Sequence, residues 1–118
     1  MKAAQEFVEV YLYRDVVDFR KSIDGLAIIV AEGLKQDAFS GALFVFCART
    51  RDKVKALYWD KSGYALWYKR LEEEKFVWPR KAEEMSVPIS GEQLRLLLDG
   101  INIWSMRAHR SLSYKNPG

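Results

Sequence analysis

Hydrophobic positions recur at two different periods along the chain, and together these periods predict both strands and helices. Alternation of apolar with polar residues, or a short unbroken apolar run, indicates a strand. Steps of three and four residues indicate a helix with one apolar face. On this basis we predict strands at residues 7–13, 42–48, 53–59, 64–71 and 76–78, and a further extended segment at residues 85–89.

Two segments have helical spacing. The longer one covers residues 18–34, where Asp18 is the expected N-cap and a glycine lies near the end. The shorter one covers residues 90–98. Its first residues match a capping box, in which Ser90 and Gln93 each satisfy a backbone N–H of the other. A glycine follows this second segment, as is common where a helix stops.

The central strands are expected to form a meander. Residues 42–48 are almost entirely apolar, which indicates a strand covered on both faces. Asp60 and Gly63 bracket a tight hairpin turn, and Pro88 confines the last extended segment to a sheet edge or a connection. We therefore predict an α+β fold: an antiparallel β-meander of about four to six strands, with one main helix packed on a face and a short C-terminal helix.

The 118 residues are enough for one domain, which we expect to span residues 1–104. Residues 105–118 have weak patterning and are predicted to form a basic, mobile tail. The net charge of +3 is unevenly distributed, because residues 49–70 contain seven basic and only two acidic residues. Such a local concentration of positive charge attracts polyanions more than the net charge suggests.

Residues that would support an enzyme are scarce. Cys47 and His109 are the only cysteine and the only histidine, so a disulfide or a zinc site built from several such ligands is excluded. The chain has neither a glycine-rich phosphate loop nor a nucleophile elbow. We predict a protein that is not an enzyme and needs no metal or cofactor. A magnesium-dependent nuclease that uses converging aspartates, for example Asp15 and Asp18, is the least favoured alternative.

No segment has the apolar length of a signal peptide core or of a membrane-spanning helix. We therefore expect a soluble protein of the cytoplasm that has no membrane partner.

The candidate binding region is the basic, aromatic-rich stretch from the first turn of the meander to its third strand. Lysine and arginine contact phosphates without reading sequence, whereas aromatic rings stack on bases. Aromatic residues at a spacing of two can equally form the core of the sheet. The candidate nucleic-acid-binding residues are Arg49, Arg51, Lys53, Lys55, Trp59, Lys61, Trp67, Tyr68, Lys69 and Arg70.

Several motifs in this order and spacing resemble one family. They are the DFRKSIDGL segment at 18–26, the LYWD segment at 57–60, the LWYKRL segment at 66–71 and the LLDGI segment at 97–101. Together they resemble the TnpB accessory protein of the IS sixty-six group of bacterial insertion sequences, over roughly residues 10–104. This protein is distinct from the RNA-guided nuclease that is also called TnpB. The family usually has an unbroken basic run at the first turn, where this chain has two arginines separated by a threonine.

The resemblance implies a small protein that is encoded beside a much larger transposase and is needed for the element to transpose. Two hypotheses follow for this chain. In the first, it is a non-catalytic factor that binds DNA, such as the ends of the insertion sequence, with weak specificity of its own. In the second, it is an interaction module that docks on the transposase or another element-encoded protein without contacting DNA. Self-association into a homo-oligomer is compatible with both.

Overall fold

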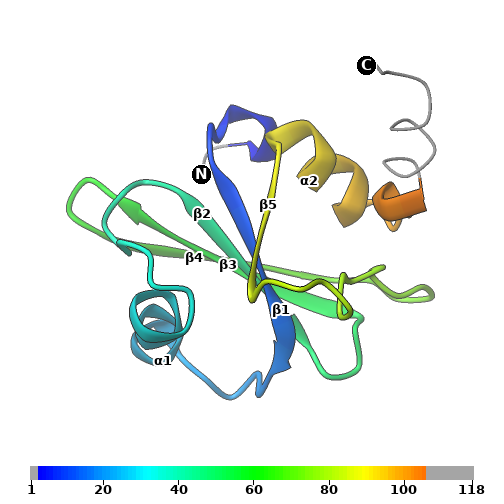
Figure 1. Cartoon of the computed structure of the whole chain (residues 1–118), viewed down its shortest axis with the longest axis horizontal. Coiled ribbons are helices and arrows are strands. Elements are labelled where there is room, and N and C mark those ends of the chain that lie inside the picture. The colour runs from blue at the N-terminus through cyan, green and yellow to red at the C-terminus, as the bar shows by residue number, and fades with distance from the viewer. Residues whose placement is uncertain (1–2, 106–118) are drawn as a thin grey trace.

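A five-stranded sheet with helices on both faces is the main feature of the computed structural model, which describes residues 3–105 (Figure 1). Helix α1 covers one face of the sheet and α2 covers the other. Among residues 3–105, no helix combines the length and apolarity that a membrane crossing requires. The elements in chain order are η1 (Ala4–Glu6), β1 (Val10–Val17), α1 (Ile23–Ile28), η2 (Ile29–Gly33), β2 (Leu43–Ala48), β3 (Lys53–Asp60), β4 (Gly63–Arg70), β5 (Ser86–Ile89) and α2 (Gly91–Leu98).

The strands are ordered β4-β3-β2-β1-β5 across the sheet. Strands β2, β3 and β4 form the antiparallel meander that the sequence predicts, and β5 pairs antiparallel with β1. Only β1 and β2 run parallel, joined by the crossover through α1 and η2. The α+β prediction is confirmed. The parallel pair has a functional consequence, because the segments that follow β1 and β2 emerge at the same end of the sheet.

Strand β2 is the centre of the molecule. All six of its residues are buried, as its unbroken apolar run predicts. Leu43, Val45 and Cys47 face the α2 side, whereas Phe44 and Phe46 face the α1 side. Burial raises the pKa of the Cys47 thiol to about 12, so this cysteine is a neutral core residue.

The main helix begins four residues later than the sequence predicts. Asp18 is not its N-cap, because its carboxylate accepts hydrogen bonds from the backbone N–H and the guanidinium of Arg20. Ser22 occupies the N-cap position of α1 instead. The α-helix continues as one π-helical turn, η2, which ends at Gly33. Residues 18–22 are therefore an exposed connection between β1 and α1.

Residues 76–78 do not form the predicted strand. The side chains of Phe76 and Trp78 are nevertheless buried in the core on the α2 side. The indole of Trp78 donates a hydrogen bond to the Tyr13 carbonyl at 2.8 Å. The aromatic and β-branched composition of this segment thus reflects burial without strand pairing.

The C-terminal part of the domain follows the sequence prediction closely. Ser90 and Gln93 form both hydrogen bonds of the capping box at the start of α2. Gly100 has a φ of 87°, a left-handed conformation that favours glycine just past a helix end. Residues 106–118 lie outside the described part of the chain, and so do His109 and nearly all of the predicted tail.

Candidate nucleic-acid interface

Three separate segments meet at one end of the sheet and make it strongly basic. The chain leaves β1 at residue 17 and β2 at residue 48, and these two residues are paired in the parallel ladder. Lys53 at the start of β3 is paired with Arg70 at the end of β4. We call the resulting surface the basic end, and it comprises residues 18–22, 49–55 and 68–70. These ranges contain eight lysine or arginine residues and two aspartates.

Lys55 fastens the first of these segments to the sheet. Its ammonium group donates hydrogen bonds to the carbonyl of Phe19 at 2.8 Å and to the carbonyl of Lys21 at 3.1 Å. The same nitrogen lies 4.8 Å from the centre of the Phe19 ring, in cation–π geometry. Lys55 therefore holds residues 19–21 against β3, and its charge is largely committed to that role.

The turn after β2 is held by its own polar side chains and by a neighbouring loop. Thr50 and Lys53 both donate hydrogen bonds to the Asp52 carboxylate. Lys75 donates to the Thr50 carbonyl at 2.8 Å. The backbone N–H of Phe76 donates to the Arg51 carbonyl at 2.7 Å. These contacts fix the backbone of the turn without using the guanidinium groups of its arginines.

The uncommitted positive charges of the basic end belong to Lys21, Arg49 and Arg51. Within residues 3–105 none of these side chains makes a hydrogen bond or an ion pair. Lys21 and Arg49 are exposed, and Arg51 is half-buried. A fixed backbone that presents free guanidinium and ammonium groups is well suited to contacting phosphate oxygens.

A shallow groove of about 360 Å³ runs between the segments that follow β1 and β2. Arg49 and Lys53 supply basic groups on one side of it, and Asp18 lies on the other. Arg20 pairs with Asp18 at 2.6 Å and so offsets its negative charge. The hydrogen bonds from Arg20 hold the pKa of Asp18 well below its ordinary value, so Asp18 remains a carboxylate within the groove. The other residues that line the groove are Val17, Phe19, Ala48 and Thr50.

The structure divides the ten candidate residues of the sequence into three groups. Six lie at the basic end: Lys53, Lys55, Tyr68 and Arg70 on the α1 side of the sheet, and Arg49 and Arg51 in the turn before β3. Trp59 and Lys61 lie at the opposite end, where Trp59 packs edge-on against Phe39 and Lys61 is at the hairpin tip. Trp67 and Lys69 point to the other face, toward α2.

Pairing also reduces the charge that several of these residues can offer. Lys69 donates to the Leu98 carbonyl at 2.8 Å, and Arg70 pairs with Glu72 at 2.8 Å. Among the aromatic candidates, Tyr68 lies nearest to the free cations. Its side chain is half exposed, and its ring centre lies 6.1 Å from that of Phe19.

Sequence reasoning did not include Arg20 and Lys21 in the candidate set. These residues are about thirty positions away from the first turn of the meander, and only the parallel pairing of β1 with β2 brings them beside it. The adjacent basic residues of the DFRKSIDGL segment were a usable signal. Without the strand pairing, however, that signal did not point to a surface shared with Arg49.

Removing the Thr50 hydroxyl is expected to raise the pKa of Asp52. The hydrogen bond from Thr50 and then the contact with Lys53 lower this pKa from 3.8 to about 2. A carboxylate with a lowered pKa stabilises the folded state above its unfolded pKa, and this contribution is lost as the pH falls from about 4 to about 2. Carboxyl NMR titration of Thr50→Val should show Asp52 titrating closer to its ordinary value, whereas Thr50→Ser should keep the low value. An unchanged Asp52 pKa in Thr50→Val would contradict the assigned role of the hydroxyl.

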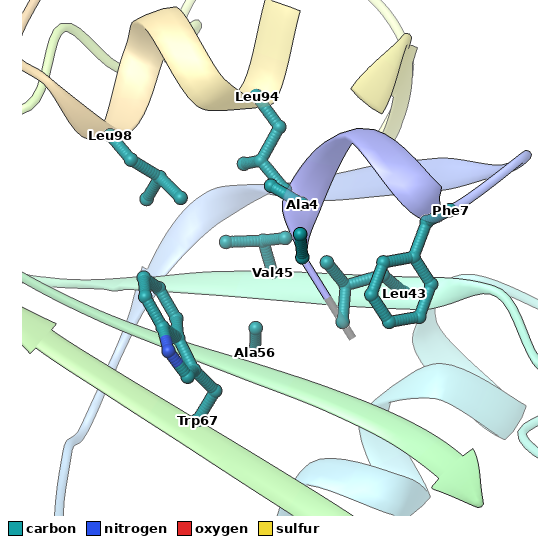
Figure 2. Close-up of a pocket in the computed structure, with 9 residues that line it drawn as sticks. Ala4, Phe7, Leu43, Val45, Ala56, Trp67, Leu94 and Leu98 are labelled. Atoms are coloured by element: carbon teal, nitrogen blue, oxygen red, sulfur yellow. The ribbon is translucent and has the colours of Figure 1, made fainter. Parts of the chain in front are cut away.

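A separate apolar cavity of about 160 Å³ lies on the α2 side of the sheet. Figure 2 shows Leu94 and Leu98 of α2 above it, Ala4 and Phe7 at one wall, and Trp67 rising from β4 to close another. No charged residue lines it within the described chain. It is therefore suited to an apolar group and not to a phosphate.

The described residues do not form a carboxylate site of the kind that a metal-dependent nuclease needs. Within residues 3–105, no group of three histidine, cysteine, aspartate or glutamate side chains is arranged to hold a metal ion. Asp15 pairs with Arg14, and Asp18 pairs with Arg20. The two aspartates that a nuclease hypothesis would use are thus engaged with arginines.

Comparisons with known proteins agree with the motifs of the sequence. The model of the family described as "IS66 Orf2 like protein" matches residues 8–108. Two proteins of Sinorhizobium fredii, both described as uncharacterized, are similar to this chain. The protein y4jC is 37% identical over 86 residues, which cover 73% of each chain. The protein y4hO is 39% identical over 95 residues, or 80% of this chain and 82% of that one.

No solved structure matches the chain. The family match extends from the residues before β1 to beyond α2, and so includes every strand of the sheet and all segments of the basic end. The chain belongs to the family of IS66 Orf2 like proteins, which are accessory proteins of insertion sequences.

Proposed function

We propose that the protein is a non-catalytic accessory factor of transposition, acting in the cytoplasm, that binds DNA through its basic end. The observation that carries this proposal is the convergence of Lys21, Arg49 and Arg51. These side chains come from two segments that are distant in sequence, and within the described chain they make no hydrogen bond or ion pair. Their supporting backbone is fixed by Lys55 and by the contacts of the 49–53 turn.

Phosphate contact is the chemistry that this arrangement favours. Of the free cations, Arg49 lines the shallow groove beside Lys53. Contacts of lysine and arginine with phosphates position a protein on DNA without reading its sequence. Tyr68, half exposed beside Phe19, is the aromatic residue placed to stack on a base or sugar next to these phosphates. We therefore propose weak sequence preference for the protein alone, with the transposase supplying specificity in the assembled complex.

Salt dependence of DNA binding tests this proposal. A labelled duplex that carries an insertion-sequence end and a scrambled duplex of equal length would be titrated with protein at several salt concentrations. Because each neutralised phosphate contributes a slope of about 0.9 in log Kd against log salt, contacts by three free cations predict a slope of roughly 3. Both duplexes should bind with similar affinity. An affinity that does not change with salt, or no binding by folded protein at low salt, would contradict the proposal.

A second candidate function is docking on another element-encoded protein, and the apolar cavity on the α2 side favours it. A cavity that is lined by leucines, alanines and Trp67 fits an apolar side chain of a partner such as the transposase. Capture of purified transposase in the presence of nuclease would support this function. If a variant that fills the cavity, for example Ala56→Leu, no longer captures the transposase, the binding site is this cavity. Capture that depends on DNA would instead support binding through the basic end.

A further inference from the structure

The outer edge of β4 is long and open. Within residues 3–105, strand β4 is the last strand on its side of the sheet and pairs only with β3. The backbone N–H of Leu71 donates to the Asp52 carbonyl at 2.8 Å. The odd-numbered residues of β4 therefore direct their backbone N–H and C=O groups toward β3. The even-numbered residues therefore direct their N–H and C=O groups away from the sheet. They are Tyr64, Leu66, Tyr68 and Arg70.

The two edges of the sheet differ in how they are protected. At the other edge, β5 is only four residues long and contains Pro88, which has no N–H to donate. Strand β4 has eight residues and no proline, and its one lysine, Lys69, turns toward α2. Two large apolar side chains on this edge are exposed, Leu66 at 36% and Tyr68 at 50%. An edge with these properties is a template for pairing with another strand.

We propose that the partner at this edge is a second copy of the same chain, paired antiparallel through β4. The strand is complementary to itself in charge: the exposed Lys61 precedes it, and the exposed residues Glu72, Glu73 and Glu74 follow it. Antiparallel pairing brings the positive start of each strand beside the negative end of the other. Parallel pairing would instead place like charges together.

A twofold axis at Trp67 gives a register that pairs the outward-facing residues of β4 favourably. Tyr64 then lies opposite Arg70 of the second copy, and Leu66 lies opposite its Tyr68. These are cation–π and apolar cross-strand pairs on the α1 side. The two Trp67 side chains meet at a position without cross-strand hydrogen bonds, where side chains approach closest. The turn residue Lys61 would lie near Glu73 of the second copy, which follows the end of its β4.

The pairing would join the two sheets into one of ten strands, continuous across the axis. Because the strands are antiparallel, the basic ends of the two copies would lie at opposite ends of the joined sheet, with residues 18–22 and 49–53 of each copy left free. The inference does not require DNA binding, since Lys21, Arg49 and Arg51 are not at the β4 edge. Tyr68 and Arg70 belong both to the basic end and to this edge, and they would form part of the dimer contact.

Sedimentation equilibrium of the full chain without DNA tests the dimer. The wild-type protein should be a dimer that dissociates on dilution. Leu66→Pro removes an outward N–H and no hydrogen bond to β3, so it should leave the circular dichroism spectrum unchanged and abolish the dimer. A wild-type protein that stays monomeric at every soluble concentration, or a Leu66→Pro variant that is folded and still dimeric, would overturn the proposal.

A charge exchange tests the direction and register of the pairing without altering the strand. Lys61→Glu and Glu73→Lys should each weaken the dimer by about tenfold, because each creates two repulsive contacts across the axis. Combining the two changes should restore a dissociation constant close to that of the wild type. A combined variant that dimerises as weakly as the two single variants would overturn the antiparallel register. A dimer dissociation constant that is unchanged in all three variants would show that the contact lies elsewhere.

Discussion

Replacing Arg49 and Arg51 together by glutamate is expected to weaken binding of duplex DNA by about a hundredfold or more at low salt. Each arginine is expected to make a charge-assisted contact with phosphate that contributes about 1.5–3 kcal/mol, and the loss of both exceeds the 2.7 kcal/mol that corresponds to a hundredfold. The reversed charge adds repulsion. Fluorescence anisotropy with the labelled insertion-sequence duplex is the measurement, and the slope against salt should fall with the affinity.

The fold should survive this change, which makes the result interpretable. The guanidinium groups of Arg49 and Arg51 have no partner in the described chain, and the turn is held by backbone groups and by Thr50, Asp52 and Lys75. The matched control is Lys35→Glu with Lys81→Glu, which makes the same change in net charge at exposed positions outside the basic end. Equal losses in both variants would show that binding follows net charge alone and would contradict a localised site.

Replacing Phe44 by alanine is expected to lower the free energy of unfolding by about 3–5 kcal/mol. Phe44 is completely buried near the start of the central strand β2, and its ring stacks on that of Tyr11 with 5.8 Å between centres. It packs in the core layer that also contains Leu26 and Val30, the residues that seat α1 and η2 on the sheet. A loss of this size is a large part of the total stability of a domain, so the thermal midpoint should fall by well over ten degrees.

Denaturant unfolding measures this effect, and a second phenylalanine provides its control. Phe39 is 60% exposed, and its ring packs edge-on against Trp59 and stacks on Tyr64. Phe39→Ala should therefore cost about 1 kcal/mol. Similar losses in the two variants would contradict the placement of Phe44 at the centre of the fold.

The sequence predicts those parts of the fold that local patterns determine. The continuous apolar run of residues 42–48 indicates a central strand, and the structure confirms it. Likewise the turn between Asp60 and Gly63 and the capping box at Ser90 depend only on residues a few positions apart. The turn and the cap are fixed by interactions within the element itself, whereas the strand is marked by its own apolar run, although its partners are β1, β3 and the two core layers.

Features that depend on distant partners were predicted less well. Asp18 has the composition of an N-cap, but its carboxylate is engaged by Arg20, and the helix starts at Ile23. Residues 76–78 have the composition of a strand because Phe76 and Trp78 are buried, although no neighbouring strand pairs with them. The local composition of these segments indicates whether a residue is buried or polar. It does not identify the residue or strand that the segment contacts.

The candidate site shows the same division. Alternation along β4 separates Tyr68 and Arg70 from Trp67 and Lys69, and this separation is visible in the sequence. Which face α2 covers is not visible, so Trp67 and Lys69 were included with residues on the opposite face. The proximity of Lys21 to the 49–53 turn follows from the parallel pairing of β1 with β2, which no local pattern reveals.

Mapping the DNA contact on the protein tests the central claim most directly. Backbone amide shifts of isotope-labelled protein would be followed by NMR during titration with the insertion-sequence duplex. The proposal predicts that the largest changes fall in residues 18–22 and 49–53, with the α2 side unaffected. Changes that spare both segments and concentrate on η1, α2 or the hairpin tip at Lys61 would contradict the assignment of DNA binding to the basic end.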